Sequence, residues 1–271
     1  MHEHGTDERG PAGGPDRGPL PLRSLEPAAA AAVRLVATDV DGTLTHGSGL
    51  DPQVVAAIAA LVDAGVEVMP VSGRPSGEVL GLARYLPGVR RGIAENGMVE
   101  VVPDQPPRLL VPAVDRAALR ELAQQVARAA GLALAVTADD PFRVVDVAFE
   151  REHRDDEVLA ALARAAATQG LFVTWSSVHV HFTRQQPDKG AALLRAAGVP
   201  GEAIATIGDA PNDAGLFVAG RFGVTVGTAD VLRQRAFMPA MPAYVTAAAE
   251  SAGFLELARA ILAARGHAPA A

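Results

Sequence analysis

Asp39 and Asp41 lie two residues apart in the segment 39–43 (DVDGT), directly after a short apolar run. Successive side chains alternate along a regular strand, so residues two apart point to the same side and both carboxylates can face one site. One can then face a metal ion and a substrate while the other stands beside the reacting centre. Gly42 allows the chain to turn at once. The alternative is an ordinary Asp-Gly turn without any chemical role.

Two more carboxylates, Asp209 and Asp213, occur in the segment 208–213 (GDAPND). Like Asp39 and Asp41, they follow a short apolar run and precede a predicted helix. Each alone is typical of a helix cap. Clustering all four carboxylates would cost much free energy unless a cation neutralised them. Their shared position at strand ends therefore favours a binding site over capping.

A third segment, 72–75 (SGRP), offers an anion-binding arrangement. Ser72 supplies a hydroxyl, and Gly73 supplies a backbone N–H at the start of a predicted helix. Helix N-termini bind phosphate through such N–H groups. Ser72 could instead simply cap the helix.

Lys189 is the only lysine among the 24 basic residues of the chain, and the others are arginine. Arginine is a broad planar fork, whereas lysine is a compact point charge on a slim stem. A position that retains lysine is expected to face a small anion in a tight pocket. The alternative is a lysine that survived by chance on a solvated helix face.

The elements around these residues predict an α/β fold. Apolar runs alternate with helical patterns, which favours a doubly wound, mostly parallel sheet with helices on both faces. Ligands of such sheets bind beyond the carboxyl ends of the strands. The strands are expected at 35–40, 66–71, 203–207 and 222–226, and the helices at 52–64, 74–85, 189–197, 212–219 and 254–264.

The middle of the chain has a different pattern, because its strands occur in adjacent pairs with alternating polarity. This pattern is typical of antiparallel, half-exposed sheet. Helices are expected at 115–130 and 155–168, and strands at 133–137, 143–149, 171–176 and 178–183. We therefore predict a core of residues 34–97 and 186–265 with an inserted α+β cap of residues 98–185. Residues 1–33, rich in Gly and Pro, are predicted to be a disordered tail.

Composition limits the function further. Of the 271 residues, 49% are hydrophobic and 20% are charged, as in soluble globular proteins. A net charge of −7 gives no reason to expect nucleic-acid binding. No apolar run is long enough to cross a membrane. The absence of cysteine excludes disulfides and fits a cytoplasmic protein.

Taken together, the motifs resemble those of the haloacid dehalogenase superfamily of phosphohydrolases. All four motifs of that family occur in order: DVDGT at 39–43, Ser72 in SGRP, Lys189 in PDKG and GDAPND at 208–213. The insert lies between the second and third motifs, as in subfamily IIB, which has an α/β cap on a Rossmann-like core. The resemblance implies a phosphatase acting through an aspartyl-phosphate.

The resemblance also implies roles for the acidic residues. Asp39 would be the nucleophile, and Asp41 would protonate the leaving alcohol and then activate water. Mg²⁺ would be held by Asp39, by the backbone carbonyl of Asp41 and by Asp209, with Asp213 at or just behind the metal shell.

Four further residues would bind phosphate in this scheme. Ser72 and Gly73 would hold the transferring group, Lys189 would offset its charge, and Asn212 would position Lys189 or the phosphate. A carboxylate can approach a phosphate dianion only where nearby cations reduce the repulsion.

The cap would select the substrate. The candidates are Asn96 at the core–cap hinge together with Arg143, His181 and Arg184. Arg143 could meet a substrate carboxylate or simply pair with Asp146, and His181 could belong to a solvated strand face. The size of the cap favours a small phosphorylated metabolite, such as phosphoglycolate or a sugar or polyol phosphate. The alternatives are a phosphomutase and a non-catalytic phosphoryl switch, and the protein is expected to be a monomer or homodimer.

Overall fold

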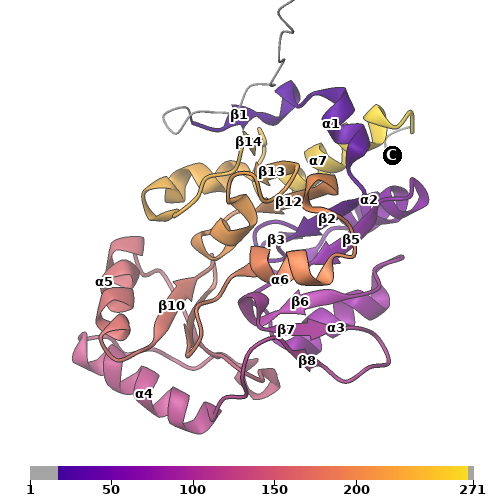
Figure 1. Cartoon of the computed structure of the whole chain (residues 1–271). Helices are drawn as coiled ribbons and strands as arrows, with labels where there is room; N and C mark the ends of the chain where they lie inside the picture. The colour runs from indigo at the N-terminus through magenta and orange to yellow at the C-terminus, as the bar shows by residue number, and fades with distance from the viewer. Residues whose placement is uncertain (1–17, 268–271) are drawn as a thin grey trace, which may run out of the picture.

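The computed structural model describes residues 18–267, and its largest sheet has six parallel strands in the order β1-β14-β13-β12-β2-β5 (Figure 1). The strands are β1 (Leu20–Pro21), β2 (Leu35–Thr38), β5 (Glu67–Pro70), β12 (Ile204–Gly208), β13 (Val224–Gly227) and β14 (Tyr244–Val245). The neighbours β12 and β2 are far apart in sequence, so the strand order reverses between them. Crevices at such switch points are where open α/β sheets bind ligands.

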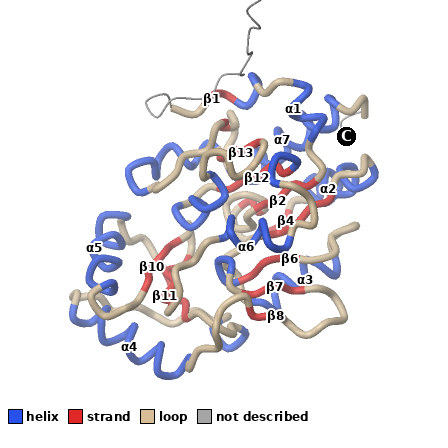
Figure 2. Tube along the Cα trace, viewed as in Figure 1, coloured by secondary structure: helices blue, strands red, loops and turns tan. Residues whose placement is uncertain are grey.

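Helices cover both faces of this sheet (Figure 2). On one face Val36 of β2 packs with α2 (Pro52–Asp63) and α7 (Glu250–Ala264). On the other face its neighbour Leu35 packs with residues of α6 (Lys189–Ala196). Successive strand side chains point to opposite faces, so an apolar run buried on both sides is what this position requires. The predicted doubly wound α/β core is confirmed.

A smaller antiparallel sheet extends the core beyond β5. It comprises β6 (Gly92–Ala94), β7 (Val99–Val101) and β8 (Arg108–Leu109), and it packs against α3 (Ser76–Tyr85). A parallel bridge between Val71 and Ile93 joins it to the main sheet. The sequence patterns did not indicate this sheet. Its strands β7 and β8 fall within the range predicted for the cap, residues 98–185, although β7 packs against α3 of the core.

The cap has a three-stranded antiparallel sheet in the order β10-β11-β9, with two helices. Its elements are β9 (Val147–Glu150), β10 (Phe172–Trp175), β11 (His179–Thr183), α4 (Arg116–Ala129) and α5 (Asp156–Ala167). Phe149 and Phe182 meet edge to face in its own apolar cluster, with ring centroids 5.5 Å apart. The inserted α+β cap of two helices on an antiparallel sheet is confirmed.

Three local predictions were wrong. Residues 133–137 form only an isolated bridge, Val136 to Phe149, because the chain turns into η3 (Asp140–Phe142) instead of pairing further. Residues 212–219 lie mostly in the 3₁₀ helix η5 (Pro211–Phe217).

The third wrong prediction concerns residues 18–33, which form β1, η1 (Leu22–Ser24) and α1 (Pro27–Ala32) rather than a disordered tail. Leu22, Ala30 and Val33 are buried there, so a few apolar contacts with the core suffice to order this segment. Residues 1–17 of the predicted tail lie outside the described residues.

The remaining elements are short. They are β3 (Thr45–His46), β4 (Gly49–Leu50), η2 (Glu95–Gly97), η4 (Gly201–Ala203) and η6 (Ala229–Phe237). Within residues 18–267, no helix is long and apolar enough to cross a membrane.

Candidate active site

The carboxyl ends of three adjacent strands carry the predicted site residues. Asp209 follows β12, Asp39 follows β2, and Ser72 comes two residues after the end of β5. Parallel strands end at the same edge of a sheet, so the fold itself brings these three positions together. All three side chains are buried.

Lys189 comes to this edge of the sheet from a helix and not from a strand, because it is the first residue of α6. Asp188 caps that helix, its Oδ1 accepting from the Ala191 N–H at 2.9 Å. The Lys189 Nζ donates to Asp39 Oδ1 and to Asp213 Oδ1, both at 2.6 Å. Its side chain is completely buried. The chain's one lysine therefore lies inside the site, and a solvated helix face is excluded.

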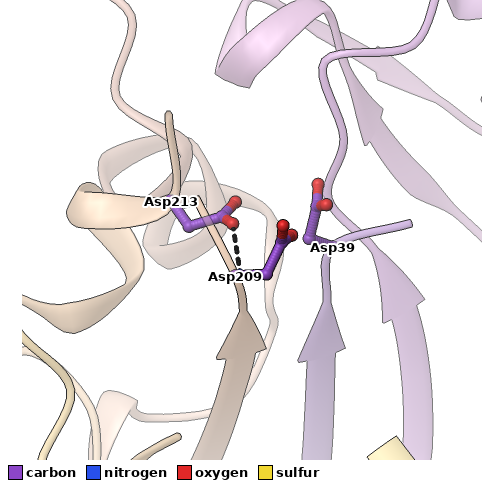
Figure 3. Close-up of side chains that lie close together, drawn as sticks. All are labelled: Asp39, Asp209 and Asp213. Atoms are coloured by element: carbon purple, nitrogen blue, oxygen red, sulfur yellow. Dashed lines mark hydrogen bonds between the residues drawn. The ribbon is translucent and has the colours of Figure 1, made fainter. Parts of the chain in front are cut away.

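Three carboxylates lie close together at this edge of the sheet (Figure 3). Asp39, Asp209 and Asp213 each offer an oxygen, and these oxygens lie within 4.8 Å of one another. The second oxygen of Asp213 accepts from the backbone N–H groups of Asp209, at 2.9 Å, and Ala210, at 3.1 Å. Asp213 is thus held from both sides and fixes the turn that carries Asp209.

The electrostatics of this cluster indicate too little positive charge. Burial, with the nearby charge of Asp213, raises the pKa of Asp39 to about 7, although Lys189 acts in the opposite direction. Burial and the neighbouring carboxylates also raise the pKa of Asp209 well above its usual value. Burial alone would lower the pKa of Lys189, but Asp213 and Asp39 raise it. The ammonium stays charged, while two carboxylates need a further cation to ionise at ordinary cost.

The donor set fits a hard divalent cation. Asp39 bonds Lys189 through one oxygen, and Asp209 accepts from the Thr43 hydroxyl through one oxygen at 3.2 Å. Among residues 18–267, no hydrogen bond reaches the second oxygen of either group. Gly42, with φ +77°, lets the two segments approach, because a Cβ there would lie 2.6 Å from Asp209 Oδ2. Oxygen ligands converging from carboxylates suit Mg²⁺.

Asp41 is bound by an arginine that the sequence analysis did not name. Arg74 donates from Nε to Asp41 Oδ2 at 2.7 Å and from Nη2 to Asp41 Oδ1 at 2.5 Å. Its Nη1 donates to Glu78 at 2.7 Å. Asp41, Arg74 and Asp209 line a cleft of about 920 Å³ between core and cap. The available signal was the motif itself, since Arg74 directly follows the predicted phosphate-binding pair Ser72-Gly73.

The remaining core candidates lie next to one another. Ser72 Oγ accepts from the Arg74 N–H at 3.1 Å, which caps the turn before α3. Asn212 Nδ2 donates to Asn96 Oδ1 at 3.1 Å, joining the fourth motif to the hinge. Within the described residues, the buried atoms Asn96 Nδ2 and Asn212 Oδ1 have no hydrogen-bond partner. Buried amide groups of this kind are suited to binding a ligand.

Two of the three cap candidates form a buried network. Arg143 donates to Asp146 at 3.1 Å, to Asp139 at 2.8 Å and to the carbonyl of Gly73 at 2.8 Å. His181 Nδ1 lies 2.8 Å from Asp146 Oδ2. The structure thus favours pairing with Asp146 over a free Arg143, and His181, which is 1% exposed, does not lie on a solvated face.

Arg184 does not join this network. It is exposed and follows the last residue of β11. The close packing instead involves Gly73, where a Cβ would lie 3.0 Å from Asn96 Oδ1 and 3.1 Å from His181 Nε2. The missing side chain at Gly73 therefore allows cap and core to meet.

Glu95 is a second residue that the sequence analysis missed. Its carboxylate accepts from the backbone N–H groups of Val144, Val145 and Asp146, the shortest at 2.7 Å. Burial, together with the charge of Asp146, raises its pKa to about 7. Glu95 and Asn96 both have positive φ, 49° and 56°. The hinge thus ties the core to the cap, and only its neighbouring Asn-Gly turn was visible in the sequence.

Comparisons with known proteins identify the family of this chain. Residues 133–237 match the family described as haloacid dehalogenase-like hydrolase. A phosphoglycolate phosphatase of Metallosphaera sedula is 31% identical over 216 residues, covering 73% of this chain and 87% of the relative.

Solved structures share the fold. A Thermoplasma acidophilum protein has a TM-score of 0.68 at 18% identity, covering 84% of this chain and 98% of its own. A subclass IIB sugar phosphatase of the same superfamily has a TM-score of 0.57 at 14% identity, covering 79% and 93%. From the relative's identity and coverage, the chain belongs to the haloacid dehalogenase-like hydrolases and is a phosphatase of that family.

Proposed function

We propose that this phosphatase is a Mg²⁺-dependent phosphomonoesterase that acts through an aspartyl-phosphate on Asp39. One observation carries the proposal. The buried Lys189 donates to Asp39 and Asp213 at 2.6 Å, in a cluster that still holds a third carboxylate, Asp209. Such a cluster has a use for a divalent cation, and that cation together with Lys189 would offset the negative charge of a phosphate bound beside it.

Asp39 and Asp209 would hold Mg²⁺, together with the backbone carbonyl of Asp41. Asp213 is better suited to a supporting role, because its two oxygens already bind Lys189 and two backbone N–H groups. When bound, the ion would supply the positive charge that lets a phosphate dianion approach Asp39.

The residues of the chain would divide the reaction into two steps. Asp39 attacks phosphorus while the bond from phosphorus to the ester oxygen breaks, and Asp41 gives that oxygen a proton. Asp41 then takes a proton from the water that attacks the aspartyl-phosphate, which releases inorganic phosphate and restores Asp39. Lys189, Ser72, the Gly73 N–H and Asn212 would hold the phosphoryl oxygens.

Phosphoglycolate is the first substrate to test. The Metallosphaera sedula relative named for that activity is 31% identical along most of its length. The cleft of about 920 Å³ that reaches Asp41 and Asp209 has room for such a small metabolite.

The test is phosphate release from p-nitrophenyl phosphate and phosphoglycolate. We expect turnover with Mg²⁺, loss of turnover with EDTA, and a loss on the order of 10⁴-fold or more in Asp39→Asn, since the amide cannot attack phosphorus. Asp51→Asn is the matched control, because Asp51 caps α2 away from the site and asparagine caps equally well. Undiminished turnover in Asp39→Asn would rule out the covalent mechanism.

A further inference from the structure

Arg74 holds the proposed proton donor in a position that a ligand must change. Its Nε and Nη2 bind both oxygens of Asp41, so the guanidinium holds this carboxyl group and keeps it from turning freely toward an ester oxygen of a substrate. An arginine fork binds a carboxylate through two parallel hydrogen bonds, and another carboxylate matches it equally well. A neutral hydroxyl group has neither the charge nor the paired acceptors to compete.

We propose that Arg74 binds a carboxylate on the leaving-group side of the substrate and thereby frees Asp41 for proton transfer. This inference rests on the proposed function and narrows its substrate class to phosphomonoesters of small hydroxycarboxylic acids. The incoming carboxylate takes the place of the Asp41 carboxylate at the guanidinium, so the charge paired with Arg74 is unchanged by the exchange. The released Asp41 carboxylate takes up a proton from solvent and can then give it to the ester oxygen.

The position of Arg74 supports this role. Its side chain is 26% exposed, and it lines the cleft together with Asp41 and Asp209. Its backbone N–H donates to Ser72 Oγ, so it is anchored beside the proposed phosphate-binding residues. A carboxylate at Arg74 and a phosphate at Ser72 would therefore belong to one short molecule.

Glu78 keeps the arginine in place when its partner changes. It binds Nη1 of Arg74 at 2.7 Å and lies one turn further along α3. The exchange therefore breaks only the two hydrogen bonds from Nε and Nη2 of Arg74 to Asp41.

The other cleft and cap arginines are less suited to bind a substrate. Arg143 has a completely buried side chain whose fork is occupied by Asp139 and Asp146. Arg151, on the cap wall of the cleft, donates to the Ser176 carbonyl and to Asp156. Arg154 and Arg233 also line the cleft, but they pair with Glu152 and Asp230. Among the arginines of residues 18–267 that line the cleft, Arg74 alone binds the proposed proton donor.

The test compares two substrates that differ in the carboxylate, 2-phosphoglycolate and 2-hydroxyethyl phosphate. The measured quantity is the ratio of their kcat/KM values in the wild type and in Arg74→Gln. We expect the wild type to favour phosphoglycolate and the variant to lose about 10- to 100-fold of that ratio, the value of a hydrogen-bonded charge pair. Arg74→Lys should retain part of the ratio, because it keeps the charge and loses the fork.

Arg84→Gln is the control, since Arg84 lies on α3, the helix that follows Arg74, and pairs with Asp104 at the surface. Its ratio should equal that of the wild type. A ratio unchanged in Arg74→Gln, or a wild type that prefers 2-hydroxyethyl phosphate, would overturn the role of Arg74 while leaving the phosphatase proposal intact. Failure of the wild type to hydrolyse p-nitrophenyl phosphate with Mg²⁺ would instead overturn the proposed function itself.

Discussion

Within residues 18–267, two clusters each pair one buried cation with two carboxylates, and only the cluster in the core is short of positive charge. In the core, Lys189 binds Asp39 and Asp213. In the cap, Arg143 binds Asp139 and Asp146. The core cluster contains a third carboxylate, Asp209, whereas the cap cluster contains a histidine in the corresponding place, His181 beside Asp146.

The pKa values of the carboxylates differ accordingly. Burial dominates at Asp39 and Asp209 and raises the pKa of both. Burial would also raise the pKa of Asp146, but Arg143 and His181 outweigh it and lower that pKa below its usual value. Burial therefore has opposite results in the two clusters. The difference lies in the third carboxylate of the core cluster and in the hydrogen bonds that Asp146 receives from Arg143 and His181. The cap cluster, whose charges are balanced, stabilises the structure. The core cluster, which has more negative than positive charge, is suited to bind a further cation.

Replacing the lysine of the core cluster should have the largest effect, and the effect should be on kcat. We expect Lys189→Arg to lower kcat by about 10²- to 10³-fold with Mg²⁺ present, because the broad fork does not fit between Asp39 and Asp213 and displaces the phosphate. Steady-state kinetics on p-nitrophenyl phosphate, with circular dichroism to check folding, measures this. Arg195→Lys, near the exposed end of α6, is the control and should match the wild type. A rate within threefold of wild type, that is about RT of free energy, would show that charge alone is required.

Removing the cation from the cap should affect stability. Arg143→Met leaves the buried Asp146 and the half-buried Asp139 without their shared cation, and we expect it to lower the free energy of unfolding by about 3–5 kcal/mol. Urea denaturation measures the loss. Arg128→Met, at an exposed position of α4, should have little effect.

The comparison predicts how Arg143→Met responds to a second change. Adding Asp146→Asn removes one of the two unpaired charges, so the double variant should recover part of the lost stability. If the double variant were less stable than the single one, the cap cluster would not be an ion-pair network of the kind described above.

The sequence predicted the core cluster better than the cap cluster. Asp39, Asp209 and Lys189 lie at the ends of regular elements, so the strand and helix patterns were enough to bring them together. Arg143 and His181 are 38 residues apart and meet only through Asp146. Glu95 accepts hydrogen bonds from backbone N–H groups that lie about 50 residues further along the chain. Partners of this kind depend on how the cap folds back on the core, which no local pattern records.

The smallest expected effect is on how the free energy of unfolding depends on pH and on Mg²⁺. It tests whether the core cluster lacks positive charge. With EDTA, the pKa of Asp39 in the folded protein is about 7, so the side chain keeps its proton up to that pH. In the unfolded chain it loses the proton near its ordinary pKa of 3.8. The folded state then binds more protons between these values, so Asp39 lowers the free energy of unfolding as pH rises from about 4 to about 7. Other buried groups titrate in this range, and subtracting the Asp39→Asn profile isolates the contribution of Asp39. Urea denaturation at several pH values gives both profiles.

Mg²⁺ should reverse the loss of stability at neutral pH, because an ion that binds only the folded state stabilises it. A difference profile that is flat, or that rises with pH in EDTA, would mean that Lys189 already balances the carboxylates and that the core cluster, like the cap cluster, needs no further cation.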